Sequence, residues 1–147
     1  MPLTKDEDIA ELLRSARTIA VVGASDRPER ASYGVMRALQ AHGYRVLPVN
    51  PNITGEHLNG EFVWRDLSQI GVPIDIVDIF RRSDAAGKAV DQAIAAGAKA
   101  VWMQLGVIDE EAAARAEAAG LKVVMDHCIK IEMRRLDIPA IENEDRA

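Results

Sequence analysis

The chain has 147 residues, of which 48% are hydrophobic and 28% charged, so it carries the apolar material of one ordinary domain, which we place over residues 1–147. Its net charge of −5 argues against a surface that neutralises nucleic-acid phosphates, because such surfaces need clustered lysine and arginine. A single cysteine, Cys128, cannot form an internal disulfide, and no apolar run approaches the roughly 20 residues of a membrane span, so we expect a cytoplasmic protein without a membrane segment.

The first predicted elements are a helix and a strand. Thr4 and Glu7 stand at capping-box spacing, and Ile9 and Leu12 after them share one helical face, which predicts an opening helix. The apolar run 18–22 follows as the first strand.

One sequence motif occurs three times along the chain: a glycine, any residue, a basic residue and an apolar run. The copies occupy residues 43–49, 97–103 and 120–125, and each follows an alanine-rich stretch suited to a helix, over 32–42, 83–96 and 109–119. Glycine ends a helix readily in the left-handed conformation, and a short apolar run after it is typical of a strand buried on both faces. Repeated helix–strand units predict a parallel sheet. Ser32, Ser83 and Asp109 are the expected N-caps of the three helices.

A fifth strand is predicted over 74–80. It alternates isoleucine and valine with Asp75 and Asp78, so we expect one less-buried face and a place at the sheet edge. The segment 50–73 reads as mainly irregular with a helix near 64–70, and 128–136 as a closing helix. These elements predict a Rossmann-like, doubly wound, five-stranded parallel α/β sheet with helices on both faces and strand order 3-2-1-4-5. Ligands bind such sheets at the carboxyl ends of the strands, where the order reverses, here expected between the first and fourth strands.

The turn after the first strand has the composition of an anion site. Gly23, Ala24 and Ser25 are small enough to let backbone amides approach a phosphate, and the following helix start adds a partial positive charge. Arg27 and Arg30 supply full charges, so the turn suits a pyrophosphate. Small residues at such a turn also serve as ordinary turn and capping chemistry with solvated arginines, and residue types alone leave that alternative open.

The turn is not the dinucleotide fingerprint G-x-G-x-x-G. Ser25 and Pro28 occupy the positions of the second and third glycines. The end of the second strand carries Asn50, where NAD-binding domains have an acidic residue for the ribose diol. NAD is therefore disfavoured, and NADP stays open because arginine accepts a ribose phosphate.

Five segments together carry a family resemblance: 22–36, 48–51, 77–81, 102–107 and 124–126. They closely resemble the small stand-alone CoA-binding proteins, which are similar to the N-terminal CoA-binding domain of the succinyl-CoA synthetase alpha subunit and of acyl-CoA synthetases that form ADP. The likeness spans Ile9 to Leu136 and recurs in order at every strand end.

The resemblance implies coenzyme A laid across the strand ends. The implied contacts are Gly23, Ala24 and Ser25 at the phosphates, Arg30, Ser32 and Tyr33 at the nucleotide, Val49, Asn50 and Pro51 beside the adenosine, Ile79, Phe80 and Arg81 on the next loop, and Gln104, Leu105 and Gly106 beside the pantetheine. Many relatives carry lysine where this chain has Asn52, so Arg27, Arg30 or Arg81 would have to supply the contact to the ribose phosphate.

We therefore expect a module that binds CoA or acyl-CoA and delivers, stores or senses it, rather than a complete enzyme. The synthetases use a phosphorylated histidine from a following domain, which this chain does not contain. The alternative is an NADP-dependent oxidoreductase or another nucleotide-binding enzyme. The three histidines lack ligand spacing, so no metal site is expected. Cys128, beside His127, is expected to be a packing residue, with a nucleophile or a mixed disulfide with CoA as alternatives.

Overall fold

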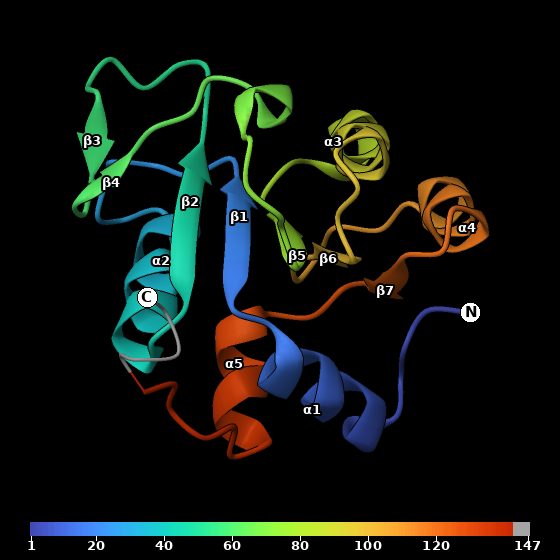
Figure 1. Ribbon diagram of the computed structural model, residues 1–147. Coiled ribbons are helices and arrows are strands. Elements are labelled where there is room, and N and C mark those ends of the chain that lie inside the picture. The colour runs from blue at the N-terminus through green and yellow to red at the C-terminus, as the bar shows by residue number, and fades with distance from the viewer. Residues whose placement is uncertain (143–147) are drawn as a thin grey trace.

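The computed structural model describes residues 1–142 and shows an α/β fold around a five-stranded parallel sheet (Figure 1). The sheet strands are β1 (Thr18–Val22), β2 (Arg45–Val49), β5 (Ile76–Ile79), β6 (Ala100–Met103) and β7 (Lys122–Val124). The helices are α1 (Asp6–Ser15), α2 (Ala31–His42), α3 (Ser83–Ala95), α4 (Glu110–Ala118) and α5 (Ile129–Arg135). The connection between β2 and β5 holds a small hairpin, β3 (His57–Leu58) and β4 (Glu61–Phe62), and a 3-10 turn, η1 (Leu67–Gln69).

Helices cover both faces of the sheet, with α1, α2 and α5 on one side and α3 and α4 on the other (Figure 1). One core contains Met36, Trp102 and Ile129, and the opposite core contains Val90 and Val123. The strands supply alternate side chains to the two cores, because successive residues of a strand point to opposite faces. The predicted doubly wound, Rossmann-like class is thus confirmed.

The predicted strand order is wrong. The sheet runs β2-β1-β5-β6-β7, which is 2-1-3-4-5 when the five parallel strands are numbered along the chain, not 3-2-1-4-5. The third strand crosses over to the far side of β1, so the order reverses between the first and third strands, not between the first and fourth. Val22 at the end of β1 pairs with Val49 of β2 and Ile79 of β5, and these strand ends form one platform.

The two aspartates of the 74–80 segment do not mark a sheet edge. Every residue of β5 is buried, and the strand lies at the centre of the sheet. Asp75 precedes the strand, and its carboxylate accepts hydrogen bonds from the backbone amides of Arg17 (2.8 Å) and Thr18 (3.0 Å). Asp78 is completely buried in the middle of β5. The alternation therefore reflects one carboxylate that hydrogen-bonds to the start of β1 and one buried carboxyl group, rather than a solvated face.

Only one of the predicted helix caps forms. The Asp109 side chain accepts a hydrogen bond from the amide of Ala112 at 3.0 Å and begins α4 as expected. Helices α1, α2 and α3 start after Lys5, Arg30 and Arg82 without a side-chain cap, so the Thr4–Glu7 capping box and the Ser32 and Ser83 caps are not formed. The uncapped start of α2 leaves backbone amides available at the carboxyl end of β1.

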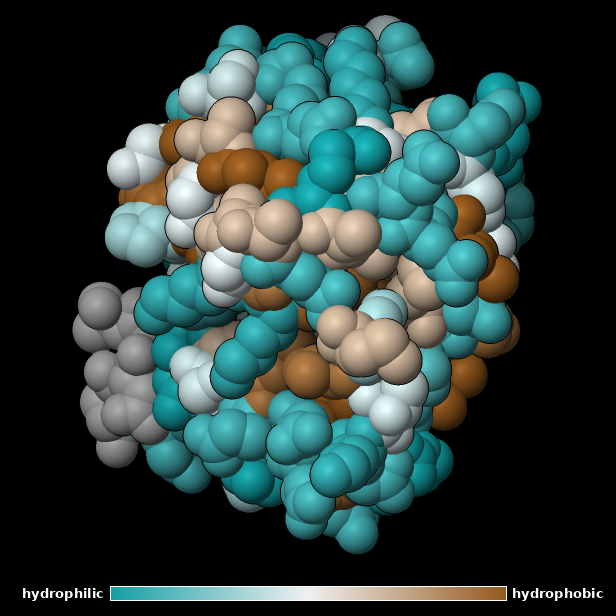
Figure 2. All heavy atoms as spheres, turned by 90° about the vertical axis from the view of Figure 1, so that its right-hand side faces the viewer, coloured by the Kyte–Doolittle hydropathy of each residue, from teal (hydrophilic) through white to brown (hydrophobic). Residues whose placement is uncertain are grey.

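Strand β2 forms one edge of the sheet, and β7 forms the other. The amide of Leu3 donates to the carbonyl oxygen of Val123 at 2.7 Å, so the N-terminal segment lies along this edge. Viewed from this side, the surface is mostly hydrophilic around a smaller apolar patch near its centre (Figure 2). Over residues 1–142, no helix combines the length and the apolar character needed to cross a membrane.

Candidate functional site

A pocket of about 850 Å³ opens at the carboxyl ends of β1, β2, β5 and β6, around the point where the strand order reverses. Ten predicted site residues line it: Gly23, Ser25, Arg30, Ser32, Asn50, Phe80, Arg81, Gln104, Leu105 and Gly106. Its further lining residues are Asp26, Arg27, Ala31, Val35, Asn52, Ile53, Arg82, Val107, Cys128 and Ile131. The structure therefore brings ten of the fifteen predicted site residues together at the carboxyl ends of the strands, beside β1.

Five predicted residues lie outside the lining. Ala24, Val49 and Ile79 are buried, with at most 4% of their surface exposed, because the side chains at these strand ends point into the core. Tyr33 turns toward Arg37, which donates to its hydroxyl oxygen at 3.4 Å, and Pro51 is exposed. Their contribution to a ligand site would be through the backbone or through packing.

The turn after β1 depends on Gly23. Its φ of +90° lies in the left-handed region, and its amide donates to the carbonyl of Val49 at 2.9 Å. A Cβ atom at this position would stand 2.1 Å from the carbonyl oxygen of Phe80. Glycine thus lets the ends of β1, β2 and β5 meet closely enough to form the pocket floor.

Backbone amides at this turn are free to bind an anion. The amides of Ser25, Asp26 and Ala31 have no hydrogen-bond partner within residues 1–142, and the Ser25 hydroxyl accepts from the Arg27 amide at 3.1 Å. Because α2 has 12 residues and starts without a side-chain cap, its N-terminus adds partial positive charge at the same place. This combination is the usual anion cradle of a βα turn.

Four arginines and one acidic residue line the pocket: Arg27, Arg30, Arg81, Arg82 and Asp26. Arg82 pairs with Asp84 at 3.2 Å, but Arg27, Arg30 and Arg81 make no salt bridge in the described part of the chain. The pocket is therefore positively charged although the whole chain carries a net charge of −5. This concentration of unpaired guanidinium groups suits a ligand with several negative charges.

The loop after β2 is held rigidly by two side chains. The Asn50 amide nitrogen donates to the Ala24 carbonyl at 2.7 Å, and the Asn50 side-chain oxygen accepts from the Asn52 amide at 2.8 Å. The Arg65 guanidinium donates to the backbone carbonyls of Asn50, Ile53 and Gly55. Arg65 was not predicted, and only the backbone pairing of Val49 with Trp64 brings it here. Asn52 lines the pocket with an uncharged side chain.

The loop after β6 is fixed from both sides. The Ser83 hydroxyl donates to the carbonyl of Gly106 at 3.2 Å and accepts from the amide of Ile108 at 2.9 Å. The Asp126 carboxylate accepts from the Gly106 amide at 2.7 Å. Ser83 therefore joins two loops of the site instead of capping α3, and Leu105, which is 66% exposed, is presented at the rim of the pocket.

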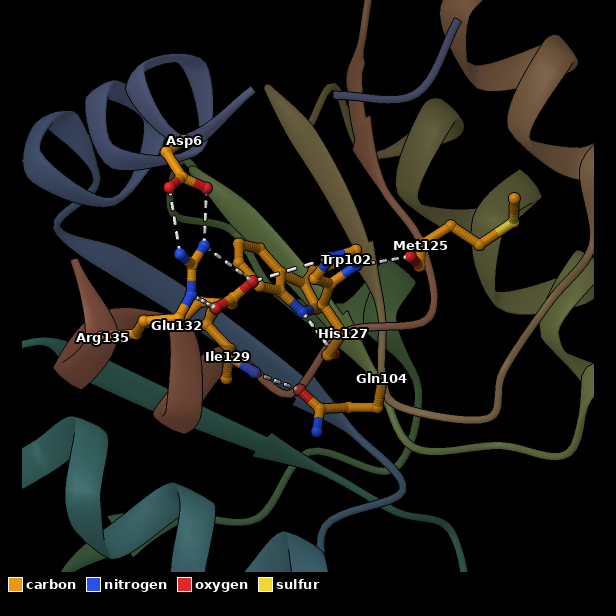
Figure 3. Close-up of polar contacts among 8 residues, drawn as sticks. All are labelled: Asp6, Trp102, Gln104, Met125, His127, Ile129, Glu132 and Arg135. Atoms are coloured by element: carbon orange, nitrogen blue, oxygen red, sulfur yellow. Dashed lines mark hydrogen bonds and ion pairs between the residues drawn. The ribbon is translucent and has the colours of Figure 1, made fainter. Parts of the chain in front are cut away.

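Gln104, after β6, and Cys128, at the start of α5, both line the pocket. The Gln104 side-chain oxygen accepts from the Ile129 amide at 3.0 Å, and its amide nitrogen points away from that bond (Figure 3). Cys128 is partly exposed and lines the pocket. Val35 and Ile131, from α2 and α5, add apolar lining that no local sequence signal could reveal, because helix packing alone brings them there.

Asp78 lies near Cys128 beneath this end of the site. It is wholly buried, and neither carboxylate oxygen has a hydrogen-bond partner among the described residues. Burial raises the pKa of Asp78 well above its ordinary value, and the charge of the Cys128 thiolate raises it further. The group is consequently a neutral carboxylic acid over a wider pH range than an exposed aspartate.

His127 does not serve Cys128 as a base. Its Nδ1 lies 2.7 Å from the carbonyl oxygen of Met125, and its Nε2 lies 3.6 Å from the carboxylate of Glu132 (Figure 3). Glu132 also binds Arg135, which pairs with Asp6 of α1 at 2.7 Å. This network ties α5 to α1. Within residues 1–142, no group of His, Cys, Asp and Glu side chains has a metal-binding arrangement.

Comparison with known protein families identifies the family of this chain. Residues 17–134 match the family described as the CoA binding domain. The chain belongs to the CoA-binding domain family. The resemblance drawn from the strand-end segments is thereby confirmed. As in other Rossmann-like domains, the pocket of this CoA-binding domain stands at the carboxyl ends of its strands.

Three known proteins are similar to this CoA-binding domain in sequence or in structure. The uncharacterised protein YneT of Bacillus subtilis (strain 168) is 40% identical over 124 residues, 84% of this chain and 90% of YneT. A hypothetical protein from Pyrococcus horikoshii OT3 has a TM-score of 0.86 at 40% identity, covering 92% of this chain and 96% of that one. Acetyl-coenzyme A synthetase 1 of Ca. Korarchaeum cryptofilum, in complex with phosphate and ADP, has a TM-score of 0.71 at 28% identity, covering 79% of this chain and 27% of the synthetase. The domain thus resembles both small proteins and part of a large one.

Proposed function

We propose that the pocket binds coenzyme A or acyl-CoA and that the protein delivers, stores or senses this cofactor. The observation that carries the proposal is the convergence of free backbone amides and three unpaired arginines on one pocket of a chain from the CoA-binding domain family. The diphosphate would rest at the turn after β1, against the amides of Ser25 and Ala31. The arginines would neutralise the diphosphate and the ribose phosphate, in place of the lysine that relatives carry at the Asn52 position.

The shape of the site fits an elongated cofactor. Asn50 follows β2 and Gln104 follows β6, and these strands are three places apart in the sheet. At about 4.8 Å per strand, the site extends over about 14 Å. Four arginines stand at the turns after β1 and β5, and the apolar lining includes Ile53, Phe80, Val35, Val107 and Ile131. A ligand that joins a charged nucleotide to a less polar pantetheine arm matches this mixed lining.

The side chains around the pocket support binding rather than turnover. His127 is engaged by Met125 and Glu132, so no histidine base is held against Cys128. A complete acyl-transfer site would need a nucleophile paired with such a base. We therefore place the chemistry of any acyl group outside this chain, in a partner that receives or supplies the cofactor.

Titration calorimetry with CoA, dephospho-CoA, NAD and NADP tests the proposal. We expect CoA to bind most tightly and Arg30→Ala to weaken CoA binding by about 10- to 100-fold, because a charge-assisted contact contributes roughly 1.5–3 kcal/mol. The loss should shrink at high salt. Arg45→Ala, at the opposite end of β2, is the matched control and should bind CoA like the parent protein. Binding of NADP without binding of CoA would overturn the proposal in favour of an oxidoreductase.

Ser25→Leu tests the diphosphate position. The larger side chain would stand over the free amides of the turn, so CoA binding should fall below detection in the calorimeter. The melting temperature should change little, since Ser25 is partly exposed and its hydroxyl bonds only to the Arg27 amide. Ser25→Ala, which keeps the space open, should retain most of the affinity. Full affinity in Ser25→Leu would place the phosphates elsewhere.

A further inference from the structure

We propose that Cys128 is a covalent attachment point for the thiol end of the bound cofactor. The attachment is a mixed disulfide, formed by exchange with the disulfide form of coenzyme A. It rests on the proposed function, because the same pocket must first hold the nucleotide.

Cys128 is held close to the strands that adjoin the anion cradle. The amide of Ile129, the next residue, donates to the Gln104 side-chain oxygen at the end of β6 at 3.0 Å. Asp78 of β5, the strand beside β1, also lies near Cys128. A pantetheine arm that starts at the cradle therefore has to cross only the ends of β5 and β6 to reach Cys128. Cys128 lines the same pocket as the cradle residues, so the path between them is open.

The thiol of Cys128 is free to react. Cys128 occupies the N-cap position of α5, but its side chain makes no capping hydrogen bond. The Gln104 side-chain oxygen binds the first helical amide, that of Ile129, in its place (Figure 3). Cys128 is the only cysteine of the sequence, and it is partly exposed, so its sulfur can reach a disulfide only in a ligand or in another molecule.

A buried polar side chain at the pocket, Gln104, points to a ligand. Gln104 is 5% exposed and lines the pocket, and its amide nitrogen has no hydrogen-bond partner within residues 1–142. Asp78, also near Cys128, is 0% exposed and lies outside the pocket lining, so it does not contact a ligand there. The Gln104 amide nitrogen is free to donate into the pocket, and an amide carbonyl of a pantetheine arm would supply an acceptor for it.

The exchange conserves atoms and electrons. The Cys128 thiolate attacks one sulfur of the CoA disulfide, the Sγ–S bond forms, and the disulfide S–S bond breaks. The departing CoA takes the electron pair as a thiolate and then a proton from water. The CoA disulfide is the oxidant, and a small thiol reverses the step. The protein would thereby hold CoA tightly under oxidising conditions and release it on reduction.

Intact-protein mass spectrometry tests the inference. The reduced full-length protein is incubated with CoA disulfide, and we expect the mass to rise by one CoA less two hydrogens and to return after dithiothreitol. Cys128→Ser should give no adduct with CoA disulfide, and the parent protein should bind reduced CoA in the calorimeter. Arg30→Ala should slow adduct formation from CoA disulfide by about tenfold or more. The same variant should react with 2-hydroxyethyl disulfide, which lacks the nucleotide, at the rate of the parent protein.

The outcomes separate this inference from the proposed function. If reduced CoA binds but no adduct forms, the covalent attachment is wrong and the binding function stands. If CoA disulfide and 2-hydroxyethyl disulfide react equally fast and Arg30→Ala changes neither rate, Cys128 is only an exposed thiol, and the inference fails. If reduced CoA does not bind at all, the proposed function fails and the attachment site fails with it.

Discussion

Asp78→Asn should become more stable than the parent protein as the pH rises above about 4. The native state raises the pKa of Asp78, so between its ordinary pKa and its native pKa the folded protein binds more protons than the unfolded chain. In that window the free energy of unfolding falls with pH by about 1.4 kcal/mol per unit. Asparagine has the same shape but no proton to lose, so the stability difference between variant and parent should grow with pH. It should level off above the native pKa.

Urea denaturation at a series of pH values measures this difference. The m-value should stay constant, which shows that the two proteins expose the same surface on unfolding. Asp78→Val is the companion variant, because it removes the unpartnered polar group as well as the charge. It should also gain stability over the parent at high pH. Parallel pH profiles for the parent and Asp78→Asn would show that the carboxyl group titrates normally and is not sealed from water.

Gly23→Ala should lower the free energy of unfolding by roughly 2–5 kcal/mol. About 1–2 kcal/mol comes from the left-handed conformation, with φ at +90°, and the remainder from overpacking. The new Cβ would stand 2.1 Å from the Phe80 carbonyl oxygen, which is backbone and cannot turn away. The ends of β1 and β5 would have to separate. Guanidinium denaturation measures the loss, and Gly23 variants are therefore unsuitable for testing ligand contacts.

Two other glycines provide matched controls. Gly120 has a φ of +92° but no atom within 4 Å of a new Cβ, so Gly120→Ala should show only the conformational cost of about 1–2 kcal/mol. Gly34 lies inside α2 with open space around it, and Gly34→Ala should stabilise the protein by roughly 0.5–1 kcal/mol. A cost for Gly23→Ala no larger than that for Gly120→Ala would contradict the close approach of Phe80.

Local sequence signals located the strands and helices well but not their neighbours in the sheet. The repeated glycine–basic–apolar motif predicts β2, β6 and β7 correctly, because a glycine after a helix and a short apolar run are signals within the segment itself. The position of β5 depends on whether the long connection crosses β1, and no residue near β5 encodes that choice. Asp78 suggested a solvated face, whereas tertiary packing buries it.

The candidate site was predictable where it follows the strand ends in sequence. The turns containing Ser25, Asn50, Phe80 and Gln104 all reach the pocket, since the carboxyl ends of parallel strands share one edge. The contributions of α5 were not predictable in the same way, because Ile131 enters the site only through the packing of α5 beside α2. Side-chain direction at a strand end, as for Val49, also depends on the core that forms around it.

The three hydrogen bonds from Arg65 to backbone carbonyls of the loop after β2 affect the rate of ligand binding. Because the loop after β2 is ordered before the ligand binds, it loses little conformational entropy on association. Diffusional encounter, rather than a slow rearrangement of this loop, should then limit the association rate of the nucleotide. Weakening the Arg65 hydrogen bonds would shorten the residence time of the bound nucleotide.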